Sequence, residues 1–212
     1  MSHEEQDRPG CDIEKPWTLT ATGRKLYYLD PSPDAIWLSD ICAHTSNLCR
    51  FTGATSQFYS VAQHLVLVGN IIHAALDKMD VPKDVDYWNQ ILAGYLHDAA
   101  EAYVGDMASP LKCAIRGKYK WIESGILRAT FEKFGVPWKW YNDVVKKADN
   151  IALGIERYYL MPSHIDWPTV KASEMTYAKP PFIDPITASA NLRTAVLHAS
   201  KQRDDAHWAR TP

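Results

Sequence analysis

The stretch LHDAAEAYVGD, residues 96–106, places a histidine, two aspartates and a glutamate in a segment whose apolar pattern is otherwise that of a buried helix. These four ionisable residues are His97, Asp98, Glu101 and Asp106. Ionisable groups are costly to bury unless they are paired, hydrogen-bonded or bound to a metal. The cluster therefore indicates a functional role for this part of the chain.

On a helix, His97 and Glu101 share a face because they are four residues apart, while Asp98 lies about 100° round the axis. Adjacent His and Asp side chains reach one metal only if it lies between their directions, and such a site needs ligands from other helices. The candidates are His64, in the first turn of an otherwise apolar helix, and Asp149, within KKADNIALGIE. Alone, His64 would be a core histidine and Asp149 a solvated residue beside lysines. The order H…HD…D on three helices favours a metal site instead.

The remaining patterns are mostly helical, and they show no βαβ alternation and no internal repeat, so the predicted fold class is all-α. Ser60 and Gln63 form a capping box before a helix that carries His64. A short strand or extended segment is expected within RKLYYLDPSP. The other expected helices are residues 40–49 capped by Ser39, Tyr87–Tyr103, Ser109 to about Phe134, residues 142–160 with Val144, Ala148, Ile151 and Ile155 on one face, and Asp184 to about Lys201.

Length and composition set the class of protein. A chain of 212 residues with 46% hydrophobic and 23% charged residues is long enough for one domain with a sizeable core. We expect an extension over residues 1–22, a catalytic core over 23–160, and a Pro- and Trp-containing C-terminal segment over 161–212 that is irregular before its last helix. The four cysteines lack C-x-x-C spacing, which favours small buried residues over zinc ligands.

Charge and hydropathy exclude several kinds of partner. A net charge of −2 argues against binding nucleic-acid polymers or anionic membranes. The first residues, MSHEEQDRPG, are unlike a signal peptide. The longest apolar run, Leu65–Leu76, is interrupted by Asn70 and His73 and is too short to span a bilayer. These features predict a cytoplasmic protein without a membrane partner.

The constellation resembles the HD superfamily of metal-dependent phosphohydrolases. The stretches YSVAQH, LHDAAEAYVGDMASPLK and KKADN are similar to its 5′-deoxynucleotidase-like branch, which includes bacterial 5′-deoxynucleotidases and phage dATP triphosphohydrolases. The resemblance runs from about Gly23 to Leu160. It implies an HD-domain helical bundle that binds its metal through four ligands, His64, His97, Asp98 and Asp149. It also implies a nucleotide substrate, a homo-oligomer, and a bacterium or a phage-infected host cell as the source of the cytoplasm.

The resemblance also implies roles for residues around the metal. Glu101 would act as general acid/base on the attacking water, and Asp106 would hold the site or the sugar. Arg50 and Phe51 match the family's Arg-aromatic pair, which contacts phosphate and sugar or base, and Lys112 matches a lysine that meets phosphate. Two plainer interpretations stay open: an N-cap or Asx-turn for Asp106 and a core position for Phe51.

The ligand set narrows the range of suitable metals, and one departure from the family pattern limits what can be inferred about the substrate. Two imidazoles and two carboxylates suit Mn, Fe, Co, Ni or Zn better than Mg, although the substrate phosphates leave room for an additional Mg²⁺. Open positions for water and phosphate require more than four-coordination, which favours Mn, Co or Fe. Many relatives have Arg-Trp where this chain has Arg50-Phe51 followed by Gly53, so no base or sugar preference is transferred.

Three classes of function stay open from the sequence. The first is a nucleotide phosphohydrolase, with a deoxynucleoside triphosphate triphosphohydrolase expected ahead of a 5′-deoxynucleotidase, although no residue separates the two. The second is a di-iron oxygenase, which needs further histidines near the metal; His73 lies about 180° round the helix from His64. The third is a non-catalytic scaffold, against which the intact set of ligands and cationic residues argues.

Overall fold

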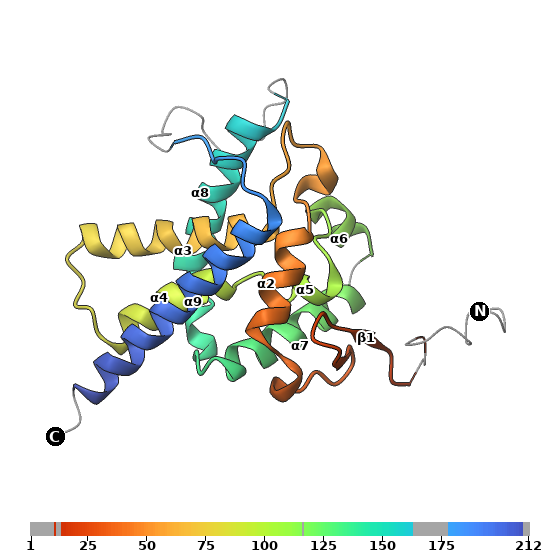
Figure 1. Cartoon of the computed structure of the whole chain (residues 1–212), viewed down its shortest axis with the longest axis horizontal. Coiled ribbons are helices and arrows are strands. Elements are labelled where there is room, and N and C mark those ends of the chain that lie inside the picture. Colours follow the sequence, from red (N-terminus) through yellow and green to blue (C-terminus); the bar gives the residue numbers. More distant parts are fainter. Residues whose placement is uncertain (1–10, 12–13, 116, 163–177, 210–212) are drawn as a thin grey trace.

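The structure is a computed structural model that describes residues 11, 14–115, 117–162 and 178–209 (Figure 1). It confirms the all-α prediction, since helices make up most of the described chain. The predicted irregular segment lies largely outside the described residues. The elements are β1 (Trp17–Leu19), β2 (Lys25–Tyr27), η1 (Pro33–Ala35), α2 (Leu38–Asn47), η2 (Phe51–Gly53), α3 (Val61–Lys78), α4 (Val85–Leu96), α5 (Glu101–Val104), α6 (Ser109–Ile115), α7 (Lys118–Lys133), η3 (Trp138–Trp140), α8 (Asp143–Leu160) and α9 (Pro185–Trp208).

Helices α3 and α4 form the centre of the bundle. Helix α9, the blue helix of Figure 1, packs against both of them and against α2, while α8 covers another side of α3. The apolar stripes of α3 and α4 are fully buried, as at Leu65, Ile91 and Leu92. Burial of such side chains contributes about 1.5–3 kcal/mol each, which makes these two helices a firm base for the groups at their ends.

The contact between α3 and α4 is close because glycines meet there. A Cβ atom built on Gly94 would lie 3.1 Å from the Gly69 Cα, so the two backbones almost touch. The ring of Tyr95 packs over Gly69, and its hydroxyl donates a hydrogen bond to Asn70 Oδ1 at 2.7 Å. This approach sets the spacing between the helix that carries His64 and the helix that leads into His97.

We expect Gly69→Ala to destabilise the protein, because its Cβ would lie 2.1 Å from two ring atoms of Tyr95. Overpacking of this kind costs about 1–3 kcal/mol, which lowers the Tm of a chain of this size by roughly 2–12 °C. Gly125→Ala in α7 is the matched control, since its Cβ would meet Pro31 at an ordinary 3.6 Å and alanine favours helix by up to about 1 kcal/mol. Equal melting temperatures for the two variants would contradict this packing.

A short antiparallel hairpin, in which Trp17 pairs with Tyr27, lies against α2 and α5. His44 joins these parts: its Nε2 accepts from the Ala21 N–H at 2.9 Å, so its Nδ1 carries the proton and donates to the Ala102 carbonyl at 2.6 Å. Asp40 also accepts two bonds from Thr22. The hairpin therefore helps to fix α5, the short helix that begins at Glu101.

Several predicted elements differ in detail. The expected helix 87–103 ends at Leu96, and residues 97–100 form a turn with bonds such as Glu101 N–H to the Asp98 carbonyl before α5 begins. The expected helix from Ser109 to Phe134 is interrupted at Gly117, whose φ of +38° no helix accommodates, and splits into α6 and α7. The apolar period of this stretch predicted one continuous helix, but tertiary contacts decide where helices break.

Two smaller expectations were also wrong, while the main caps were right. Helix α2 starts earlier than expected, with Trp37 at its N-cap and Ser39 inside it. On α8, Val144 and Ile151 are about 40% exposed, while the expected Ala148 and Ile155 are buried, together with Val145 and Ala152. The capping box at Ser60 and Gln63 is confirmed, as is the cap at Asp184 before Pro185, although α9 continues to Trp208.

Candidate metal centre

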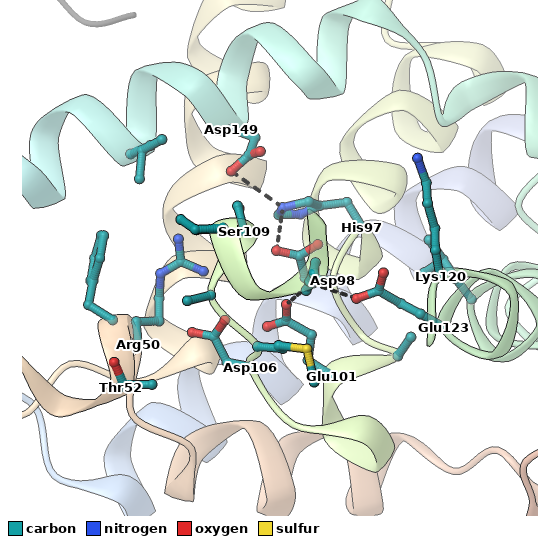
Figure 2. A pocket seen from close by; sticks show the side chains of 18 of the residues that line it. Arg50, Thr52, His97, Asp98, Glu101, Asp106, Ser109, Lys120, Glu123 and Asp149 are labelled. Carbon is teal, nitrogen blue, oxygen red and sulfur yellow. Dashed lines mark hydrogen bonds and ion pairs between the residues drawn. The ribbon is translucent and has the colours of Figure 1, made fainter. Parts of the chain in front are cut away.

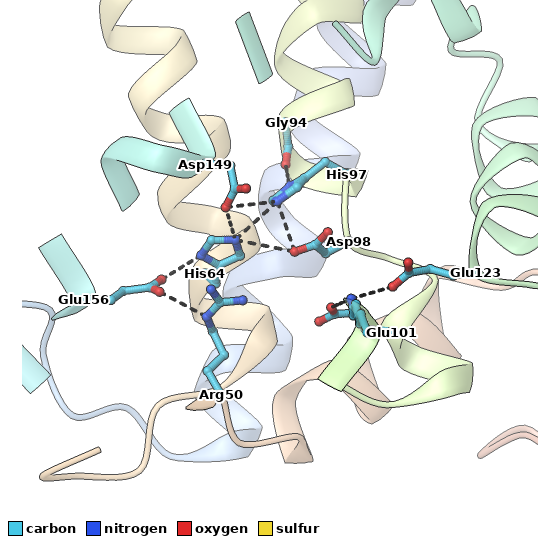
Figure 3. A network of polar contacts seen from close by, with 10 residues as sticks. Arg50, His64, Gly94, His97, Asp98, Glu101, Glu123, Asp149 and Glu156 are labelled. Carbon is cyan, nitrogen blue, oxygen red and sulfur yellow. Dashed lines mark hydrogen bonds and ion pairs between the residues drawn. The ribbon is translucent and has the colours of Figure 1, made fainter. Parts of the chain in front are cut away.

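Four side chains from three parts of the bundle converge on one point (Figure 3). His64 Nε2 lies 3.2 Å from His97 Nε2, 3.2 Å from Asp149 Oδ1 and 3.6 Å from Asp98 Oδ2. His97 Nε2 lies 3.2 Å from Asp98 Oδ2 and 3.8 Å from Asp149 Oδ1. The structure therefore brings together the four residues that the sequence predicted as ligands.

Local structure explains how each ligand is placed. The capping box fixes the first turn of α3, which holds His64 at the helix start. His97 and Asp98 occupy the turn that follows α4, where backbone hydrogen bonds such as Ala99 N–H to the Leu96 carbonyl span three residues instead of four. Asp149 reaches the same point from α8, which packs against α3. The sequence did not predict this tighter turn.

Hydrogen bonds at the far nitrogens orient both imidazoles. His64 Nδ1 lies 2.7 Å from Glu156 Oε1, and His97 Nδ1 lies 2.9 Å from the Gly94 carbonyl oxygen. An ionised carboxylate and a carbonyl only accept hydrogen bonds, so each Nδ1 carries the proton. Each Nε2 then presents its lone pair to the centre, as in the carboxylate–histidine–metal arrangement of known metal sites.

Electrostatics show that this centre attracts positive charge. Burial opposes ionisation of Asp98 and Asp149, but the adjacent imidazoles outweigh it and lower the pKa of both carboxyls. Burial likewise opposes charge on His97, yet Asp98 and Asp149 raise its pKa well above the usual value. Two Nε2 lone pairs facing each other at 3.2 Å beside two carboxylates repel one another unless a cation, a proton or a metal, lies among them.

The ligand spacing fits a single metal ion. Metal–ligand bonds of about 2.1 Å place neighbouring ligands about 3.0–3.4 Å apart in octahedral or tetrahedral sites. The measured spacings of 3.2–3.8 Å lie at or slightly above this range. His64, His97 and Asp98 also offer donor atoms that all lie within 4.8 Å of one another. The donor set and its geometry therefore both suit a divalent transition metal.

A large cavity opens in front of this centre (Figure 2). Its volume is about 760 Å³, and His97, Asp98 and Asp149 lie on its wall while His64 is fully buried behind them. The cavity is also bordered by every other residue that the sequence singled out, namely Arg50, Phe51, Glu101, Asp106 and Lys112. Residues as far apart in the sequence as Arg50 and Asp149 thus line one cavity.

Glu101 is a buried carboxylate beside the candidate metal ligands. Lys112 Nζ donates to its Oε1 at 3.2 Å, whereas its Oε2 has no hydrogen-bond partner among the described residues. Burial raises the pKa of Glu101 well above its usual value, and the charges of Asp98 and Asp106 raise it further. One oxygen is therefore held by Lys112, while the other is a buried atom without a hydrogen-bond partner among the described residues.

Arg50 is the buried cation of the site. It follows α2 by three residues, and it is only 8% exposed. Its Nε donates to Glu156 Oε2 at 3.1 Å. Burial opposes its charge, but Glu156 and the acidic residues of the cavity raise the pKa of Arg50 above its usual value. The guanidinium therefore stays charged at the cavity wall.

The two residues whose roles were left open both border the cavity. Asp106 lies in the loop after α5, and burial raises the pKa of its carboxyl. Phe51 is half-buried with a left-handed φ of +54°, and the Arg50 guanidinium carbon lies 5.4 Å from its ring centroid. A core position for Phe51 is therefore wrong, although contact with the nucleobase of a substrate stays a prediction.

Three residues of the site were missed by the sequence analysis. Glu156 bonds to both His64 and Arg50, and its position seven residues after Asp149 on the same helix face was a usable signal. Glu123 accepts from Lys112 at 2.6 Å, and Lys120 borders the cavity beside it. Both are on α7 among many charged residues, so the sequence gave no means of distinguishing them.

Comparison with known proteins places the chain in a family. The uncharacterized protein YfdR of Escherichia coli K12 is 35% identical to it over 158 residues, which make up 74% of this chain and 80% of YfdR. The chain belongs to the family of YfdR. An uncharacterized protein of Rhodobacter capsulatus is 34% identical over 127 residues, covering 59% of this chain and 61% of that protein. No model of a known protein family matches the chain.

Neither relative's name states an activity, so the chemistry of the YfdR family member described here is argued from its own residues. Among the described residues, none of the helices has the length and apolar character needed to cross a membrane.

Proposed function

We propose that this chain is an HD-superfamily phosphohydrolase that uses one divalent transition metal to cleave the 5′ phosphoester of deoxynucleotides. The observation that carries the proposal is the convergence of two histidines and two aspartates at the wall of a 760 Å³ cavity that also holds a buried glutamate and a buried arginine. Mixed nitrogen and oxygen ligands suit Mn, Co, Fe, Ni or Zn.

His64, His97, Asp98 and Asp149 would hold the metal, which supplies a water of lowered pKa and polarises the phosphoryl oxygen when bound. Glu101, which borders the cavity, then takes the proton from the attacking water. Burial and the neighbouring carboxylates raise the pKa of Glu101, which makes it a stronger proton acceptor than an exposed glutamate. The same group returns the proton to the leaving 5′ oxygen of the sugar.

The cations of the cavity would bind the phosphate. Arg50 offers a planar guanidinium held at Nε by Glu156, which leaves its Nη groups for phosphate oxygens. Lys112 lies between Glu101 and Glu123, so a phosphate that approaches it also approaches the proposed base. Phe51, and Asp106 on the loop after α5, would contact the nucleobase and the sugar of the substrate.

A triphosphate is our first candidate substrate, because a third cation borders the cavity. This cation is Lys120, which is on α7 like Glu123 (Figure 2). A monophosphate needs only Arg50 and Lys112, whereas the distal phosphates of a dNTP would extend toward Lys120. The products would be a nucleoside and triphosphate. Mg²⁺ would accompany the substrate phosphates, and cytoplasmic localisation and homo-oligomer formation stay predictions.

A product assay tests this proposal. Protein loaded with Mn²⁺ or Co²⁺ would be given each dNTP and each dNMP, with orthophosphate and triphosphate separated by phosphorus NMR. We expect triphosphate and free nucleoside from a dNTP. Orthophosphate from dNMPs alone would replace the first candidate with a 5′-deoxynucleotidase. No hydrolysis across the panel would favour a non-catalytic scaffold, and two tightly bound irons would favour an oxygenase.

We expect Lys120→Ala to raise the KM for dNTPs by about 10- to 150-fold, the range of one charge-assisted phosphate contact, and to leave dNMP hydrolysis unchanged. Lys118→Ala is the control, because Lys118 is on the same helix but does not border the cavity. Steady-state kinetics on both substrate classes distinguish the outcomes. An equal rise for dNTPs and dNMPs would remove Lys120 as a contact of the distal phosphates.

A further inference from the structure

Glu156 links the metal centre to the cation of the phosphate site. Its Oε1 lies 2.7 Å from His64 Nδ1, and its Oε2 accepts from Arg50 Nε at 3.1 Å (Figure 3). The side chain is fully buried on α8, two turns beyond Asp149. One carboxylate therefore holds a metal ligand with one oxygen and the cation of the cavity wall with the other.

We infer that Glu156 is a positioning residue that couples metal binding to phosphate binding, because His64 and Arg50 share its two buried oxygens. The inference rests on the proposed function, since it takes the four ligands to bind a metal and Arg50 to bind a phosphate.

The coupling follows from competition for one negative charge. When Arg50 holds Oε2 strongly, less charge remains on Oε1 to attract the proton at His64 Nδ1, and His64 Nε2 is a weaker metal ligand. A phosphate at the Nη groups of Arg50 draws the guanidinium's charge toward itself. Glu156 then acts more strongly on His64, and the metal is bound more tightly. By linkage, the metal increases phosphate affinity by the same factor.

The surroundings of Glu156 make this effect large. Arg50 and Glu156 are both buried, and charges interact strongly where water is excluded. The hydroxyl of Tyr59, which is also buried, is a third donor to the same carboxylate. Despite its burial, these neighbours lower the pKa of Glu156, with His64 and Arg50 the largest contributors. Glu156 is thus an anion shared among three donors.

Glu156→Gln separates the two functions of the carboxylate, because an amide has one acceptor oxygen and one NH₂ donor. The oxygen will face the charged Arg50, so the NH₂ will face His64 Nδ1. His64 must then accept at Nδ1 and carry its proton on Nε2, where it points at the metal position. We expect the Mn²⁺ affinity to fall by about 10- to 100-fold, the usual effect of losing a partner of a ligand histidine.

The decisive experiment is a double-mutant cycle with the full-length wild type, Arg50→Ala, Glu156→Gln and the double variant. The Mn²⁺ affinity of each protein is measured by calorimetric titration, with and without inorganic phosphate. Arg50→Ala frees Glu156 for His64 and should raise Mn²⁺ affinity. This rise should be at least about 2-fold larger with Glu156 present than in the Glu156→Gln background, the lower end for coupled neighbours. Equal effects in both backgrounds would overturn the coupling.

Tyr59→Phe keeps the test decisive even if Glu156→Gln does not fold. It removes a donor from the carboxylate without touching metal or phosphate, so the Mn²⁺ affinity should rise, and an unchanged or lower affinity would overturn the inference. Circular dichroism confirms folding. Because these are binding measurements, a coupled protein that hydrolyses no nucleotide refutes only the proposed function. If the enzyme is active but the effects of Arg50→Ala and Glu156→Gln on Mn²⁺ affinity are additive, only the coupling is refuted.

Discussion

Glu101→Gln is expected to lower kcat by about 10²- to 10⁴-fold while the protein still binds its metal. Glutamine keeps an oxygen for Lys112 Nζ, now 3.2 Å from Oε1, so the local fold is preserved. It cannot accept a proton, so the attacking water loses its base. Steady-state kinetics on the preferred nucleotide and metal content by elemental analysis, both on the same preparation, measure the two quantities.

The control for Glu101→Gln is Glu132→Gln, an exposed carboxylate on α7 that does not border the cavity. It should leave kcat and metal content unchanged. If Glu101→Gln loses metal in proportion to activity, then Glu101 supports the ligands and is not the proton acceptor. If activity survives, the base must be another residue of the cavity, with Asp106 the first to test.

Asp98→Ala is expected to abolish both metal binding and hydrolysis. It removes one of two carboxylates that balance the charge of the ion, and the loss of a direct ligand should exceed the roughly 10- to 100-fold weakening caused by loss of an outer partner. A bound ligand stabilises the native state by mass action, so Mn²⁺ should raise the Tm of the wild type and not that of Asp98→Ala.

Differential scanning fluorimetry with and without Mn²⁺ measures this shift, and Asp30→Ala is the matched control because Asp30 is exposed and does not border the cavity. The control should retain the full Mn²⁺-dependent rise. A Tm of Asp98→Ala that still rises with Mn²⁺ by the wild-type amount would show that the metal binds elsewhere, and the four-ligand centre would be wrong.

The sequence was most informative where local chemistry is strong. The capping box at Ser60 and the Asp184–Pro185 pair fix helix starts through hydrogen bonds between neighbouring residues, and both were placed correctly. Helix ends were predicted less well. Helix α4 was extended through Tyr103, because alanines and apolar residues continue the pattern while the chain in fact turns at residues 97–100.

The turn after α4 shows how a wrongly predicted element can still contain residues that the fold brings together. The ligand prediction used helix geometry for His97 and Asp98, yet the structure brings these two together with His64 through a turn that leaves the helix. The residue types carried the inference because few arrangements make a buried His-Asp pair stable. The order of the ligands along the chain supplied the rest.

What the sequence determined by itself is the all-α class, the four candidate ligands and the cations near them, because residue chemistry and helical period are local properties. The tertiary structure alone decided which carboxylates bond to the candidate ligands and cations. Glu156 serves both His64 and Arg50, and Glu123 holds Lys112, because α8 and α7 pack where they do. Such pairings join residues up to 106 positions apart, and no local pattern records a distance that only packing creates.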